Sequence, residues 1–279
     1  MSDGEALGEG LLELAVRAAA EAATLVAARR SGGVRVSGTK SSDVDIVTEV
    51  DTECERLLRS LVLTARPEDG FLGEEGDDVI GSSGVRWIAD PIDGTVNFLY
   101  GLPQYAVSLA AEVDGEVVAG VVVNPATGVA YRARRGGGAW RWQGPAASKD
   151  ARPERLEVRG AVPVAERLVL TGFNYEAHIR RIQAAAAASL LPRVRDIRRL
   201  GACALDLCHV AEGAADGYVE EGVELWDHAA GALIAEEAGA RSVRTVGRGG
   251  KAALVCAPET GFDDFWALVR DAGFLAEGE

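Results

Sequence analysis

Positive charge is scarce in this chain. Its 279 residues contain 43 Asp and Glu against 29 Lys and Arg, so the formal net charge is −14. A protein that binds a nucleic-acid backbone needs Lys and Arg to replace the counterions of the phosphates, and this balance argues against a nucleic-acid partner. It leaves a small phosphorylated partner open, because a bound divalent cation inverts the local field.

Paired cysteines and long apolar runs are missing as well. None of the four cysteines forms a C-x-x-C pair, and a chain of this size needs no disulfide bonds, so we expect reduced thiols. The first residues include Asp3, Glu5 and Glu9 in place of the basic segment of a secretory signal. No apolar run approaches the roughly 20 residues of a membrane-spanning helix. These features predict a cytoplasmic protein with no membrane partner.

Helical and strand patterns follow one another in the first half of the chain. Apolar residues recur at helical spacing over 6–30 and again from Thr48 to Pro67, and the polar segment 36–44 between them is interpreted as an exposed loop. Short β-rich runs separated by turn residues then predict strands at 85–89, 105–113, 116–123 and 128–134. Residues 1–145 are therefore interpreted as two helices followed by an antiparallel sheet.

The second half, residues 146–279, alternates strands and helices. Strands are predicted at 167–170, 194–197, 217–220 and 252–256, and helices at 176–190, 203–212, 227–237 and 261–271. Such alternation is typical of α/β architecture. We expect the two halves to form one compact unit.

An acidic run, Asp-Pro-Ile-Asp-Gly-Thr at 90–95, comes directly after the predicted buried strand 85–89. Pro91 restricts the backbone on both sides, and Gly94 permits a sharp turn. Thr95 is a suitable N-cap for a helix whose first N–H groups would face an anion. The alternative is an ordinary Asp-rich turn. A metal site needs further oxygen ligands, because Mg²⁺ takes several.

Two other acidic positions are candidates for those ligands. Glu74 and Glu75 lie in a glycine-flanked turn, and Asp227 follows Trp226 at the start of a predicted helix. Each also has an ordinary structural interpretation, as solvent-facing acids and as an N-cap. Spacing alone does not show that these groups converge.

In combination, these segments resemble the inositol monophosphatase family of lithium-sensitive, Mg²⁺-dependent phosphatases. The resemblance covers about residues 9–272 and is specific in its paired signatures. The matching stretches are 43–51 (DVDIVTEVD), 73–75 (GEE), 87–98 (WIADPIDGTVNF) and 224–231 (ELWDHAAG). It implies a layered αβαβα sandwich, a homodimer and an active site that holds two or three Mg²⁺ ions.

The same resemblance implies a role for each matching residue. Glu74, Asp90 and the carbonyl of Ile92 would hold a first metal, Asp90, Asp93 and Asp227 a second, and Glu74 with waters a weaker third. The implied catalytic residues, which activate the attacking water, are Glu74, Thr95 and Asp51. The implied substrate contacts are Asp93, Gly94, Thr95, Cys203 and Glu220, and Lys40 would lie in a mobile loop over the site.

The family resemblance leaves the substrate open. Glu220 and the sequence after Asn97 favour a polyol phosphate, above all myo-inositol 1-phosphate, over histidinol phosphate or fructose 1,6-bisphosphate. The stretch Gly201-Ala202-Cys203-Ala204 departs from the Gly-Ser-Ala-Ala or Gly-Thr-Ala-Ala common in the family. A non-enzymatic sensor of phosphorylated metabolites is a further alternative, although sensing alone does not require the water-activating residues.

Overall fold

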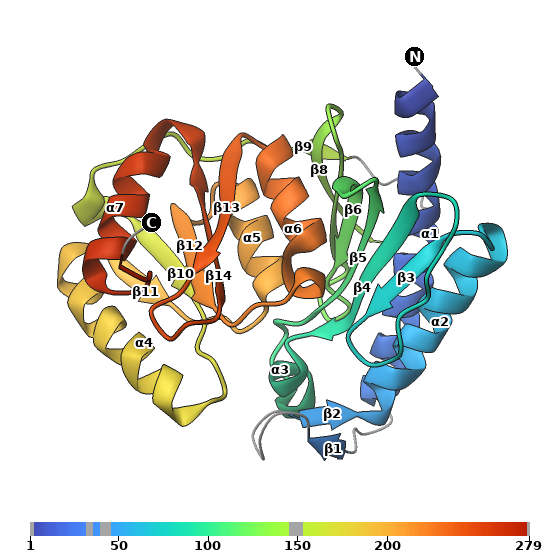
Figure 1. The fold of residues 1–279 in the computed structure, drawn as a ribbon, viewed down its shortest axis with the longest axis horizontal. Helices are drawn as coiled ribbons and strands as arrows, with labels where there is room; N and C mark the ends of the chain where they lie inside the picture. The colour runs from blue at the N-terminus through green and yellow to red at the C-terminus, as the bar shows by residue number, and fades with distance from the viewer. Residues whose placement is uncertain (1–2, 32–35, 40–45, 145–152, 278–279) are drawn as a thin grey trace.

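Helices and sheets alternate in five layers along the long axis of the molecule (Figure 1). The computed structural model describes residues 3–31, 36–39, 46–144 and 153–277. From one side to the other the layers are two helices, a seven-stranded sheet, two helices, a five-stranded sheet and two helices. The layered α/β fold expected from the sequence is confirmed.

The first layer contains helices α1 (Asp3–Ser31) and α2 (Glu49–Ala65), which pack against one face of the seven-stranded sheet. The alanines of α1 at helical spacing are buried, so the helix lies close to β5 and β6. Thr48 is the N-cap of helix α2, and its capping box with Asp51 satisfies backbone N–H groups at the start of the helix. Both predicted helices are confirmed.

The seven-stranded sheet contains its strands in chain order, β3 to β9. Strand β3 is parallel to β4, and every other neighbouring pair is antiparallel, as the predicted meander requires. The strands are β3 (Gly70–Gly73), β4 (Val85–Asp93), β5 (Ala106–Val113), β6 (Glu116–Val123), β7 (Val129–Arg134), β8 (Gly138–Gln143) and β9 (Glu154–Arg155). Strands β3, β8 and β9 were not predicted.

Two of the sequence predictions in this half are wrong. Residues 36–39 are not loop but strand β1 (Val36–Thr39), which pairs with β2 (Ile46–Thr48); a polar strand whose partner is this short gives little signal in the sequence. Asp90 and Asp93 do not follow the buried strand but belong to it. The pairing of β4 with β5 is irregular between these two residues, since Pro91 has no N–H for the ladder.

The second sheet has the order β11-β10-β12-β14-β13, with β10 parallel to β11 and β12, and β14 antiparallel to its neighbours. Its strands are β10 (Leu168–Thr171), β11 (Asp196–Arg198), β12 (Gly217–Glu221), β13 (Ala240–Val246) and β14 (Ala252–Pro258). Strand β13 was not predicted. The remaining helices are α3 (Thr95–Tyr100), α4 (Ala177–Leu190), α5 (Cys203–Ala211), α6 (Leu225–Glu237) and α7 (Phe262–Ala272), with 3₁₀ turns at Val164–Glu166, Leu191–Arg193 and Glu259–Gly261.

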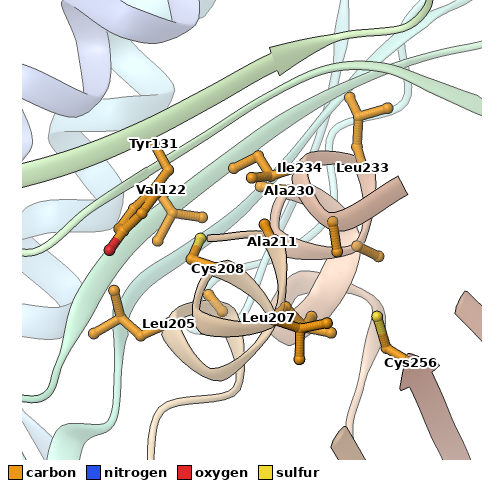
Figure 2. Packing of buried hydrophobic residues seen from close by; sticks show 14 of the residues in the cluster. Val122, Tyr131, Leu205, Leu207, Cys208, Ala211, Ala230, Leu233, Ile234 and Cys256 are labelled. Atoms are coloured by element: carbon orange, nitrogen blue, oxygen red, sulfur yellow. The ribbon is translucent and has the colours of Figure 1, made fainter. Parts of the chain in front are cut away.

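Helices α5 and α6 form the middle layer and contact both sheets. In Figure 2, Tyr131 and Val122 of the seven-stranded sheet face Cys208 and Leu205 of α5 across this core. Helix α6 lies so close to β6 that a Cβ added to Gly120 would be 2.9 Å from the Cα of Ala230. This close packing fixes the start of α6, and therefore Asp227, beside the end of β4.

Two elements that follow residue 145 also belong to the first half of the molecule: β9 pairs with β8, and α6 packs on the seven-stranded sheet. The predicted division of the chain into residues 1–145 and 146–279 stays a prediction. Among the described residues no helix is both long and apolar enough to cross a membrane.

Candidate active site

A cavity of about 300 Å³ opens where the end of β4, the first turns of α5 and α6 and the end of β12 meet. Acidic residues dominate its wall, and Arg199 and Lys251 contribute the positive charges. The residues predicted from the sequence that line it are Glu74, Asp90, Ile92, Asp93, Gly94, Thr95, Cys203, Glu220 and Asp227. The chain therefore brings together acids that are up to 153 residues apart in sequence.

Asp90 lies deepest among these acids, with 2% of its surface exposed. One carboxylate oxygen accepts the backbone N–H of Ile92 at 3.0 Å. Burial and the neighbouring carboxylates of Glu74 and Asp93 raise the pKa of Asp90 well above its ordinary value. In the described part of the chain no Lys, Arg or His forms an ion pair with Asp90, Asp93 or Asp227.

Asp93 connects the two halves of the molecule. Its carboxylate accepts the backbone N–H groups of Cys203 at 3.1 Å and of Ala204 at 2.7 Å, the first two residues of α5. These are N–H groups with no partner inside the helix, so a carboxylate is a favourable acceptor for them. Burial raises the pKa of Asp93 to about 7, although the two N–H donors oppose the shift.

Asp227 lies in the first turn of α6. The helix starts at Leu225 with Glu224 as N-cap, so the predicted start at Asp227 and the alternative N-cap role for that residue are wrong. The carboxylate instead reaches back to accept the Glu224 N–H at 2.6 Å. Burial, with Glu74 and Asp93 nearby, raises the pKa of Asp227 well above its usual range.

Thr95 is the first residue of α3, and Gly94 before it is the N-cap, so the predicted N-cap role of Thr95 is wrong. Gly94 has φ +87°, and a Cβ there would lie 2.9 Å from the carbonyl oxygen of Gln104; only glycine meets both conditions without strain. The Thr95 hydroxyl lies 3.2 Å from Asp51 Oδ1 and 3.0 Å from the Ile92 carbonyl oxygen. Asp51 does not line the cavity, and it is fully buried while its other oxygen accepts the N–H and hydroxyl of Thr48.

Glu220 and Cys203 line the cavity from the end of β12 and the start of α5. Tyr218, which was not predicted, donates its hydroxyl to Glu220 Oε2 at 2.9 Å. Burial raises the pKa of Glu220, against the opposing effects of Tyr218 and Arg199. The signal was present in the sequence, because residues two apart on a strand share a face.

Lys40 lies outside the described residues. Among those that are described, no three His, Cys, Asp or Glu side chains are arranged as a finished set of ligands around one point. The acids line one cavity, and neighbouring carboxylates contribute to the raised pKa values of Asp90, Asp93 and Asp227, but the described side chains do not surround one point as the ligands of a bound metal do.

This geometry can be compared with known proteins. The family model of the inositol monophosphatase family matches residues 8–267. The chain belongs to the inositol monophosphatase family. Membership identifies it as a phosphatase. The family resemblance drawn from the sequence motifs is therefore confirmed.

Relatives within the inositol monophosphatase family support this assignment over most of the chain. Inositol-1-monophosphatase SuhB of Mycobacterium tuberculosis is 46% identical over 260 residues, which cover 88% of this chain and 87% of the relative. A protein of Pasteurella multocida called Nus factor SuhB is 36% identical, with 82% and 83% covered. The solved structure of M. tuberculosis SuhB superposes with a TM-score of 0.81 at 42% identity, covering 96% of this chain and 98% of that one.

Proposed function

We propose that this phosphatase hydrolyses the phosphate monoester of a small polyol in a Mg²⁺-dependent reaction, with myo-inositol 1-phosphate as the favoured substrate. One observation carries the proposal. Asp90 and Asp93 of β4, which are buried, and the partly buried Asp227 of α6 form no ion pair with a described residue, and they converge on a cavity that Glu220, an acceptor for hydroxyl groups, also lines. The M. tuberculosis relative is called an inositol-1-monophosphatase, which supports the same substrate.

The acids fit a hard divalent cation in charge and in donor type. Buried carboxylates without a positive partner are costly, and oxygen ligands are those that Mg²⁺ prefers. Glu74, Asp90, Asp93, Asp227 and the carbonyl of Ile92 would hold two or three ions. Bound Mg²⁺ would supply the positive charge that phosphoryl transfer to water requires.

The chain's own residues would prepare the attacking water. When the Thr95 hydroxyl donates its proton to Asp51, its lone pairs are free to accept a proton from a water in the cavity. Glu74 lines the same cavity and would be the second acceptor. No histidine lines the cavity, and burial raises the pKa of the Cys203 thiol well above its usual value, so neither type of residue offers a nucleophile there.

Phosphate release tests the proposal directly. The substrates are inositol 1-phosphate, fructose 1,6-bisphosphate, histidinol phosphate and 3′-phosphoadenosine 5′-phosphate, each with Mg²⁺ and with a chelator. We expect Mg²⁺-dependent turnover with the highest kcat/KM on inositol 1-phosphate. A preference for histidinol phosphate would overturn the substrate, and no Mg²⁺-dependent turnover of any would favour a sensor. The homodimer and the cytoplasmic location stay predictions.

A further inference from the structure

The carboxylate of Glu220 accepts a hydrogen bond from a buried tyrosine of its own strand. Tyr218, with no exposed surface, donates its hydroxyl proton to Glu220 Oε2 at 2.9 Å. The Tyr218 hydroxyl is therefore removed from solvent, and its one proton is given to Glu220.

Gly172 leaves the space that the carboxyl group of Glu220 occupies. A Cβ added to Gly172 would lie 2.0 Å from each of the three carboxyl atoms of Glu220. The strand register explains this closeness, since Thr171 of β10 pairs with Val219 of β12 and the chain then continues to Gly172 and Glu220. The Thr171 hydroxyl, which donates to the Val219 carbonyl at 2.7 Å, ties the two strands together at this point.

The arrangement leaves acceptor capacity facing the substrate. An ionised carboxylate has about four lone-pair sites, and the Tyr218 hydroxyl occupies one. Glu220 lines the cavity, whereas Tyr218 and Gly172 do not. A hydroxyl group of a ligand can donate to the remaining sites, and a second phosphate placed there would be repelled.

We propose that Tyr218 and Gly172 are positioning residues that hold Glu220 as a hydroxyl acceptor, and so set the preference of the cavity for polyol monophosphates over bisphosphates and phosphate esters without hydroxyl groups. The inference rests on the proposed function, which assigns Glu220 to the substrate. Neither residue touches the reacting phosphate; both act through Glu220.

Tyr218→Phe tests the hydroxyl, with inositol 1-phosphate and phenyl phosphate, which has no hydroxyl group, as probes. We expect KM for inositol 1-phosphate to rise about tenfold while kcat stays within about twofold, because a contact made equally in ground and transition state is lost. The kinetic constants for phenyl phosphate should change by less than about twofold. A loss of stability alone would affect both substrates alike.

Tyr131→Phe is the matched control. Tyr131 is also buried in the middle core (Figure 2) and also donates to a glutamate, Glu212 Oε2 at 3.1 Å, but neither residue lines the cavity. Tyr131→Phe removes a phenolic hydroxyl from the same core as Tyr218→Phe does. We expect both kinetic constants to remain at the wild-type level with both substrates.

Gly172→Ala tests the position of the carboxylate without removing a hydrogen-bonding group. The added methyl group meets the end of a flexible side chain, so Glu220 moves and the fold is retained, which circular dichroism checks. The same selective rise in KM for inositol 1-phosphate is expected, together with a smaller discrimination against fructose 1,6-bisphosphate. If wild type hydrolyses inositol 1-phosphate but both variants leave the ratio of the substrates unchanged, the positioning role is wrong and the proposed function stands. If wild type does not hydrolyse inositol 1-phosphate, the proposed function itself fails.

Discussion

Two parts of the cavity wall, one formed by β4 and α6 and the other by β12 and α5, hold carboxylates in different surroundings. On the wall formed by β4 and α6, Asp90 and Asp227 lie beside other acids, and the described residues offer them no ion-pair partner. On the wall formed by β12 and α5, Glu220 has a hydroxyl donor in Tyr218 and the charge of Arg199 nearby. The side chains are chemically alike, but their partners differ.

That difference separates binding a cation from binding a substrate. Acids that raise one another's pKa store unfavourable charge, which a divalent ion relieves. An acid that is already hydrogen-bonded from behind has no such need and can accept hydroxyl groups in front. We therefore expect substitutions in the first part of the wall to weaken metal binding, and substitutions in the second to alter substrate selectivity.

The largest effect is expected for Asp90→Asn. It removes a buried charge that neighbouring acids destabilise, so we expect turnover to fall at least about a thousandfold while the metal-free protein melts no lower than wild type. Steady-state phosphate release and thermal unfolding in a chelator measure the two quantities. Near-normal turnover would show that Asp90 is not a metal ligand.

Metal binding should stabilise the wild-type fold. A ligand at a hundredfold excess over its Kd adds about 2.7 kcal/mol to the free energy of unfolding. We expect Mg²⁺ to raise the Tm of wild type and of Glu220→Gln alike, and to raise that of Asp90→Asn much less. Equal stabilisation of all three proteins by Mg²⁺ would show that Asp90 contributes no more to metal binding than Glu220 does.

Glu220→Gln is expected to have an intermediate effect confined to the substrate. The amide retains the shape of the side chain but loses the charge, so KM for inositol 1-phosphate should rise about tenfold. Isothermal titration with Mg²⁺ should give an unchanged affinity. A weaker Mg²⁺ affinity in this variant would assign Glu220 to the metal wall instead.

The sequence predicted most elements because their patterns are local. The apolar spacing of α1 and α2 and the turns between β5, β6 and β7 required no knowledge of distant contacts. Strands β3 and β8 were missed because their burial depends on remote parts of the chain. Strand β13 is mostly exposed or half-exposed and is held by its pairing with β14, which is also a tertiary property.

The site shows the same limit. The acidic run could be recognised from motifs, and Tyr218 from its spacing to Glu220, whereas Gly172 carries no motif and acquires meaning only when β10 pairs with β12. Asp93 and α5 are a further case, because the hydrogen bonds from Cys203 and Ala204 span more than a hundred residues. Chain order gives the residue types of a site, but strand register decides which of them support one another.

Glu212, outside the cavity, is a carboxylate with basic partners. Its substitution is expected to have the smallest effect. Its Oε1 lies 2.9 Å from His209 Nδ1, and its Oε2 lies 3.3 Å from Arg141 Nε. Burial raises the pKa of Glu212, but His209, Tyr131 and Arg141 together outweigh it, so the net shift is downward. A depressed pKa stabilises the fold above the unfolded-state value of about 4.3, and this stability is lost as pH falls through the folded value.

Glu212→Gln should therefore cost about 1 kcal/mol in the free energy of unfolding at pH 7, and less as pH falls below about 4. Urea unfolding of both proteins across this range measures the difference. A cost that is the same at low and neutral pH would mean that packing, not charge, stabilises this cluster. Unchanged Mg²⁺-dependent turnover at pH 7 is also expected, because Glu212 lies outside the cavity and a carboxylate that already has basic partners has no need of a metal ion.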